Sequence, residues 1–220
     1  MESFKPAKQA PVYQAIATLY AGTREKHLPE GWVGEAMAYL LEADQPPMRK
    51  VCSDGAPYGN LLFRASRADI GRVRKEPVGP FTMGCSGFVK TGAVLYLAAA
   101  YKMLRRARVQ AAFGTIEQVT LHRRGRFCSG PCGNNLFQAF AAHGGYGESP
   151  GMTAHLRYLE SKQKPDGGWE DRIPFIPTVH ALAKVDREAA DRMFRKALPK
   201  IEKTRNRDGT WGRSDRRSEE

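Results

Sequence analysis

The stretch Gln163-Lys164-Pro165-Asp166-Gly167-Gly168-Trp169 decides the fold of this chain. A weaker copy, Arg207-Asp208-Gly209-Thr210-Trp211-Gly212, follows it, and both the two tryptophans and the two aspartates are spaced 42 positions apart. Aspartate and glycine suit a tight reversal, because the carboxylate accepts backbone N–H groups and glycine tolerates positive φ. Such a turn, recurring with helix-patterned sequence between its copies, predicts a repeat of helical hairpins.

The other residues of the turn have separate predicted roles. Trp169 is expected to pack one hairpin against the next, with its indole N–H on a single acceptor. Gln163 stands three residues before the aspartate and can hydrogen-bond back across the turn. Arg205 holds that place in the second copy, so the second copy is imperfect.

The sequence before the first turn predicts two helices. Ser149-Pro150 is an N-cap followed by proline at the first helical position. A helix from there to about residue 163 carries three apolar residues on one side, Met152, Leu156 and Leu159. Upstream, residues 135–143 read as a short apolar helix that Gly144-Gly145 ends.

After the turn, Asp186 is predicted to cap a helix, and Pro199 is expected to kink it. Its apolar residues recur with the amphipathic helical period and are Ala190, Met193, Phe194, Ala197, Leu198 and Ile201. The predicted order from residue 135 is therefore helix, loop, helix, turn, helix, loop, helix, turn.

The N-terminal half carries a similar pattern. Residues 11–21 and 31–43 are predicted to form a helical hairpin, and residues 91–104 the most apolar helix of the core. Cys-Ser pairs begin at residues 52, 85 and 128, each before an apolar segment. This echo favours hairpins over the whole chain, although three chance pairs explain it equally well.

Residues 125–213 resemble the prenyltransferase and squalene oxidase repeat proteins. The resemblance rests on the run that begins Cys128-Ser-Gly-Pro-Cys-Gly-Asn-Asn-Leu-Phe and on Gln163-X-X-Asp166-Gly167-X-Trp169, which is similar to the repeat motif of squalene and hopene cyclases. It implies an all-α fold, the α/α toroid, in which helical hairpins form a ring with an inner and an outer layer. At 42 residues a hairpin the chain is short for a full ring, so we expect an open ring, or one completed by a missing segment or a partner chain.

Length and composition predict one domain over residues 1–220, with residues 1–10 and 213–220 loose. The start of the chain has no secretory pattern, and no apolar run approaches the ~20 residues that span a bilayer. We therefore expect a cytoplasmic protein with reduced cysteines, and a peripheral membrane contact stays open.

The net charge of +12 comes from local clusters that suit nucleic acid, anionic head groups, a diphosphate, or simply a solvated surface. No nucleic-acid-binding motif supports the first of these. The clusters are Arg64, Arg67, Arg72, Arg74 and Lys75; Lys102, Arg105, Arg106 and Arg108; and His122, Arg123, Arg124 and Arg126.

The resemblance directs attention to two kinds of chemistry. Hopene-type cyclases protonate their substrate with an Asp-X-Asp-Asp segment, which this sequence lacks. Protein prenyltransferases hold zinc, for which Cys128, Cys132 and His180 are weak candidates, because Cys-X3-Cys without a second close pair is poorly specific. Small buried thiols are the favoured interpretation of both cysteines, and no cofactor is predicted, with zinc as the alternative.

Other chemistry-bearing residues favour structural roles. His143 is expected to close a helix C-terminus as a cation. Glu148, Glu170 and Asp171 are expected to be exposed turn carboxylates rather than a catalytic pair.

Two functions remain. The chain is either a prenyltransferase-like or cyclase-like protein that binds or acts on an isoprenoid or other apolar substrate, or a non-catalytic scaffold for ligand or protein binding. Its catalytic residues, if it has any, are unknown from the sequence.

Overall fold

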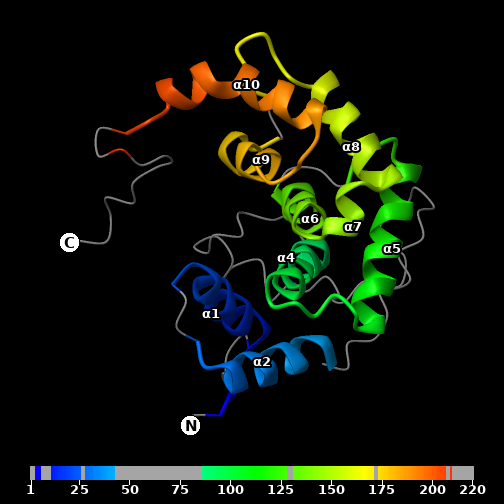
Figure 1. The fold of residues 1–220 in the computed structure, drawn as a ribbon, viewed down its shortest axis with the longest axis vertical. Coiled ribbons are helices and arrows are strands. Elements are labelled where there is room, and N and C mark those ends of the chain that lie inside the picture. Colours follow the sequence, from blue (N-terminus) through cyan, green and yellow to red (C-terminus); the bar gives the residue numbers. More distant parts are fainter. Residues whose placement is uncertain are drawn as a thin grey trace.

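A computed structural model describes residues 3–5, 11–25, 28–42, 86–127, 131–170, 173–206 and 209. Within these residues the regular elements are all helices, which confirms the predicted all-α class (Figure 1). They are α1 (Pro11–Glu25), α2 (Glu30–Glu42), α4 (Ser86–Ala100), α5 (Ala107–His122), α6 (Pro131–Ala142), α7 (Gly144–Gly147), α8 (Pro150–Ser161), α9 (Phe175–Leu182) and α10 (Glu188–Lys203). None of the described helices is long and apolar enough to cross a bilayer.

The helices alternate between two layers that curve together as an arc (Figure 1). In the inner layer α1 contacts α4, α4 contacts α6, and α6 contacts α9. In the outer layer α5 contacts α8, and α8 contacts α10. Each inner helix leads into an outer one, so the described residues form four helical hairpins, and these leave the arc open between its α1–α2 end and its α9–α10 end (Figure 1).

The apolar faces of the helices meet between the layers. The largest side chains there are four fully buried phenylalanines, Phe113, Phe127, Phe137 and Phe140. The ring of Phe140 lies 5.3 Å from that of Phe113 and 4.9 Å from that of Phe127, centroid to centroid. The inner helices α4 and α6 pack closely because Gly92 has no side chain: a Cβ there would lie 3.0 Å from the backbone of Asn135.

Gln163 links the turn to the next hairpin. Its side-chain Nε2 donates to the carbonyl oxygens of Gly167, at 3.1 Å, and of Met193 in α10, at 2.9 Å. The predicted bond across the turn is therefore confirmed, and the same amide also binds a helix 30 residues later in the chain.

Trp169 links the turn to the preceding hairpin. Its indole Nε1 donates to the carbonyl oxygen of Leu159 in α8 at 3.0 Å, and the side chain is buried. Its ring lies 6.0 Å from that of Phe175 at the start of α9. Asp166 Oδ1 accepts from the N–H of Gly168 at 3.0 Å, as its position in the turn predicts.

Three glycines of positive φ mark the repeat. Gly125, Gly167 and Gly209 have φ of +92°, +81° and +82°, and 42 residues separate each from the next. A Cβ on Gly125 would overlap the carbonyl oxygen of Ala154 in α8, and one on Gly167 would overlap that of Lys196 in α10. Each of these two glycines thus lets a turn approach the outer helix that follows.

The copy around Gly125 was not predicted. Its aromatic residue is Phe127, which stands 42 residues before Trp169 and is buried in the same way. In the last copy, the Nε of Arg205 donates to the carbonyl oxygen of Gly209 at 3.4 Å, as Gln163 does to Gly167. Asp208 and Trp211 lie outside the described residues.

Several predicted boundaries need correction. Asp186 does not cap α10: the N-cap is Arg187, which makes no capping bond with its side chain, and Asp186 is exposed one residue earlier. The helix expected over residues 91–104 begins at Ser86 and ends at Ala100, and the short helix before Gly144-Gly145 begins at Pro131. Pro199 lies inside α10 on its exposed side, and the helix continues to Lys203; the kink expected at Pro199 stays a prediction.

Candidate functional site

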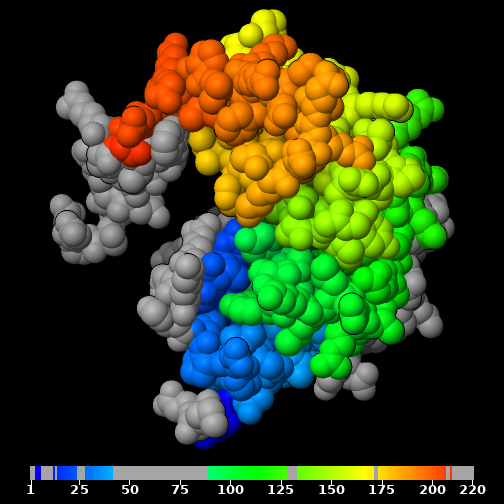
Figure 2. Space-filling view, viewed as in Figure 1, coloured from blue at the N-terminus to red at the C-terminus, as the bar shows by residue number. Residues whose placement is uncertain are grey.

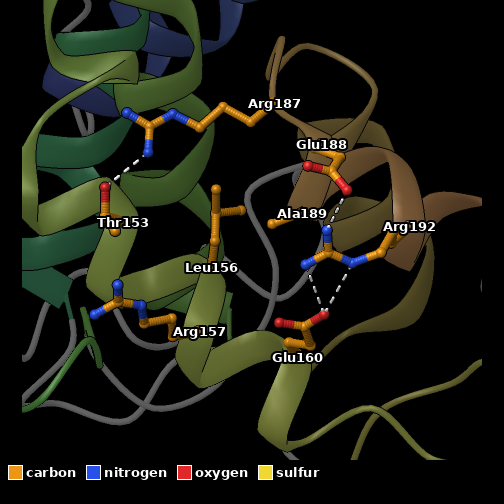
Figure 3. Close-up of a pocket in the computed structure, with 8 residues that line it drawn as sticks. All are labelled: Thr153, Leu156, Arg157, Glu160, Arg187, Glu188, Ala189 and Arg192. Atoms are coloured by element: carbon orange, nitrogen blue, oxygen red, sulfur yellow. Dashed lines mark hydrogen bonds and ion pairs between the residues drawn. The ribbon is translucent and has the colours of Figure 1, made fainter.

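A solvent-facing groove of about 400 Å³ lies between α8 and α10 (Figure 3). Its apolar floor comes from Leu156 and Ala189. Three arginines and two glutamates surround this floor, so the lining carries a net charge of +1. The full lining is Thr153, Leu156, Arg157, Glu160, Arg187, Glu188, Ala189 and Arg192.

One end of the groove is closed by an ion-pair cluster (Figure 3). Arg192 Nη2 lies 3.2 Å from Glu160 Oε1 across the two helices, and Arg192 Nη1 lies 2.9 Å from Glu188 Oε1 one helical turn earlier. The two glutamates raise the pKa of Arg192 above its ordinary value. This arginine therefore connects α8 with α10 through ion pairs at the protein surface.

The guanidinium groups of Arg157 and Arg187 lie toward the other end of the groove (Figure 3). Arg187 Nη1 donates to Thr153 Oγ1 at 2.7 Å, and Thr153 Oγ1 in turn donates to the carbonyl oxygen of Ser149 at 3.2 Å. Arg157 is exposed, and the structure gives it no hydrogen bond or ion pair within the described residues. Together they offer donors for an anionic group above an apolar surface.

A second groove of about 360 Å³ lies between α2 and α5. It is lined by Ala38, Leu41, Met103, Arg106, Ala107 and Arg108. Arg108 Nη1 donates to the carbonyl oxygen of Leu41 at 2.5 Å. Both grooves thus lie between outer helices, with arginine at the N-cap of the second helix, Arg106 in one and Arg187 in the other.

Buried polar groups also occur where α4 meets α6. Lys90, Thr91 and Asn134 are each more than nine-tenths buried. The Thr91 hydroxyl and the Asn134 Oδ1 have no hydrogen-bond partner within the described part of the chain. No described pocket reaches these atoms.

The proposed zinc candidates are not tested as a set. Cys128 lies outside the described residues, Cys132 lies in the first turn of α6, and His180 is exposed on α9. Among the described residues no three histidine, cysteine or acidic side chains are close enough together to hold a metal ion.

His143 is not the helix-closing cation that was expected. It follows α6, but its Nδ1 accepts the N–H of Tyr146 at 3.3 Å and so caps the short helix α7. Burial lowers the pKa of His143, because desolvation penalises the charged ring. A neutral ring is needed for the Nδ1 to accept at all.

His155 is a core residue. It is buried against Phe127 and Phe137, with ring centroids 4.3 and 4.7 Å away. Its Nδ1 donates to the carbonyl oxygen of Gly125 at 2.8 Å, which ties α8 to the turn of the preceding hairpin. Burial lowers the pKa of His155 to about 4, although the bond to Gly125 favours the charged form.

The carboxylates near the turns are exposed, as predicted for Glu148 and Glu170. Glu170 Oε2 lies 3.0 Å from Lys162 Nζ. Asp166 Oδ2 accepts from Lys200 Nζ at 2.6 Å, and this bond, with the N–H of Gly168, holds the pKa of the Asp166 carboxyl below its usual value. Asp171 lies outside the described residues.

The groove residues Arg157, Arg187 and Arg192 were missed by the sequence analysis. Arg157 and Arg192 are spread over two helices separated by the turn, and no local motif connects them. The sequence did contain one sign of this groove. Arg157 and Glu160 lie three residues apart in one helix, next to Leu156 of its predicted apolar side.

Comparisons with protein-family models, curated proteins and solved structures found no match to this chain.

Proposed function

We propose that this chain is an α/α-toroid repeat protein of the prenyltransferase and squalene oxidase repeat type that serves as a non-catalytic binding scaffold. The two-layer alternation of inner and outer helices and the 42-residue turn support the toroid architecture. Several residues of types that often act in catalysis have structural roles here. His143 caps α7, His155 ties α8 to a turn, and Asp166 pairs with Lys200.

The groove between α8 and α10 is the proposed binding site. The observation that carries this proposal is that Arg157 and Arg187 both line one groove, beside the partly exposed Ala189 (Figure 3). An extended peptide fits such a site when it carries an acidic side chain beside an apolar one. The carboxylate binds the guanidinium groups, and the apolar side chain packs beside Ala189, which is the partly exposed apolar residue of the lining.

An isoprenoid diphosphate is the second candidate ligand, because the same groove offers cationic donors beside apolar surface. An isoprenoid diphosphate carries its diphosphate at one end of an apolar tail. The family resemblance implies a ligand of this class. The peptide and the isoprenoid diphosphate differ in length and in charge. Measuring the binding of each to the same chain therefore separates the two proposals.

The test measures binding of a fluorescein-labelled peptide of alternating glutamate and leucine, and of farnesyl diphosphate, by anisotropy and calorimetry at one ionic strength. Arg157→Glu should weaken peptide binding by about tenfold, since it removes a charge-assisted hydrogen bond and adds a repulsive charge. Arg126→Glu is the matched control, because Arg126 is an exposed arginine outside both grooves.

Equal losses in the two variants would mean that only the overall positive charge attracts the peptide, and would overturn the groove as its site. Stoichiometric binding of farnesyl diphosphate, followed by its turnover, would replace the scaffold proposal with the enzyme. Native mass spectrometry with zinc present and absent extends the same comparison to the metal.

A further inference from the structure

The groove between α2 and α5 combines two arginines with an apolar lining. Its lining residues are Ala38, Leu41, Met103, Arg106, Ala107 and Arg108. None of these described residues is acidic, so the lining carries a net charge of +2, whereas two glutamates reduce the charge of the groove between α8 and α10. Figure 2 shows α2, in blue, beside the green α4–α5 hairpin at the surface of the molecule.

The two arginines of this groove have different surroundings. Arg108 Nη1 donates to the carbonyl oxygen of Leu41 near the end of α2, so this side chain joins the two helices. Arg106 is exposed, and its side chain neither caps α5 nor makes a hydrogen bond or ion pair within the described residues. The guanidinium group of Arg106 can therefore donate to an anion in the groove.

The backbone adds a donor next to Arg106. The first N–H groups of a helix have no partner within the helix. The N–H of Ala107, the first residue of α5, has no hydrogen-bond partner within the described residues, and the first turn of α5 has no acidic side chain. Because Arg106 and Ala107 are neighbours in the chain, one anion can accept from both.

The next outer helix shows which chemical group fills such a place in this fold. At the start of α8, the N–H of Gly151 donates to Glu117 Oε1 at 3.1 Å. Glu117 belongs to α5, the outer helix that packs against α8. The outer helix beside α5 is α2, and its residues in the groove, Ala38 and Leu41, carry no carboxylate. The carboxylate found at α8 therefore has no counterpart among the described residues of the groove at α5.

The rest of the lining indicates what else the ligand carries. Ala38 and Met103 are partly exposed and Ala107 is exposed, so an apolar group beside the bound carboxylate would leave water. Apart from the arginines, the lining has no hydroxyl, amide or carboxyl side chain. A peptide backbone laid across it would lose water without new hydrogen bonds, which is unfavourable. The volume of about 360 Å³ is that of a small-molecule site.

We propose that the groove between α2 and α5 binds a small monocarboxylate with a short apolar chain. The carboxylate accepts from the guanidinium group of Arg106 and from the N–H of Ala107. The apolar chain lies against Met103 and Ala38. This site is separate from the groove between α8 and α10, so the two binding proposals stand or fall independently.

Binding of three small probes tests the chemical class of the ligand. Hexanoate, hexanamide and acetate are titrated into the ¹⁵N-labelled full chain at one ionic strength, and the amide signals are followed by NMR. Hexanoate should bind saturably and shift the signal of Ala107. Hexanamide should bind about tenfold more weakly, because it has no charge for Arg106. Acetate should also bind about tenfold more weakly, because it has no chain to cover the apolar lining.

Three arginine variants locate the site. Arg106→Gln should weaken hexanoate binding about tenfold. Arg105→Gln is the matched control, since Arg105 is exposed, adjacent in sequence and outside the groove lining. Arg157→Gln removes the same charge from the groove between α8 and α10 and should leave hexanoate binding unchanged. Circular dichroism checks that each variant stays folded.

Several results would overturn this proposal. They are the absence of saturable hexanoate binding, hexanamide or acetate binding as tightly as hexanoate, and equal losses in Arg106→Gln and Arg105→Gln. A loss in Arg157→Gln alone would place the carboxylate in the other groove. An acidic peptide that binds between α8 and α10 while hexanoate does not bind would overturn the monocarboxylate site and leave the proposed function in place.

Discussion

The amide of Gln163 donates to the carbonyl oxygen of Met193, 2.9 Å away, and so joins the turn after α8 to the middle of α10. The same amide donates to Gly167 within the turn. One side chain thus fixes the shape of the turn and the position of the next outer helix.

Replacing Gln163 with alanine should therefore destabilise the chain. We expect a loss of about 1 to 2 kcal/mol, because two hydrogen bonds disappear and their carbonyl acceptors are partly buried. Urea unfolding followed by circular dichroism measures it. Arg205→Ala is the control at the equivalent place of the last copy, where the loss should be about 0.5 kcal/mol or less. Equal losses would show that the link to α10 contributes nothing.

Trp169→Ala should cost more, about 3 to 5 kcal/mol, as truncations of large buried side chains do. Trp169→Phe keeps most of the ring but loses the bond to the Leu159 carbonyl, so a loss of about 1 kcal/mol is expected. The same unfolding assay applies to both variants. A loss under 1 kcal/mol for the alanine variant would refute the role of Trp169 in packing the hairpins together.

The three glycines of the repeat should respond unequally to alanine. Gly209→Ala should lose only the roughly 1 to 2 kcal/mol that a left-handed backbone costs an L-residue. Gly167→Ala should lose clearly more, because its Cβ would also overlap the backbone of α10. Melting temperatures of both variants and of Gly125→Ala test this order. A Gly209 variant as unstable as the Gly167 variant would mean that an element not seen in the described residues packs there.

His155 should make stability depend on pH. Its pKa is about 4 in the folded chain and about 6.5 when unfolded, so between these values the unfolded chain binds more protons. Stability then rises with pH through this window and is lost as pH falls from about 6.5 toward 4, by about 3 kcal/mol in total. Chemical unfolding at a series of pH values measures the slope.

His155→Gln is the matched variant for this slope. Glutamine can still donate to the Gly125 carbonyl but does not titrate, so the slope between pH 4 and 6.5 should flatten by that amount. An unchanged slope in this variant would show that other groups carry the acid sensitivity.

Local sequence patterns correctly predicted features that a cap residue or an apolar period marks within one helix. Ser149 caps α8 as expected, with its Oγ accepting the N–H of Met152 at 3.2 Å, and the α10 residues Ala190, Met193 and Ala197 are buried. Asp186 failed as a cap because the chain stays extended for one more residue, and Arg187 is the residue that precedes the helix.

The sequence by itself determined the repeat where its copies are alike, because a tight turn needs particular residues at fixed places, and Asp-Gly-X-Trp shows them at residues 166–169 and 208–211. It also determined the all-α class, because the helical period of apolar residues can be recognised within about a dozen neighbouring residues. Only the tertiary structure decided which turns touch which helices and where arginines gather. The groove of Arg157 and Arg187 and the groove of Arg106 and Arg108 arise from contacts between hairpins, and such contacts depend on residues 30 or more positions apart.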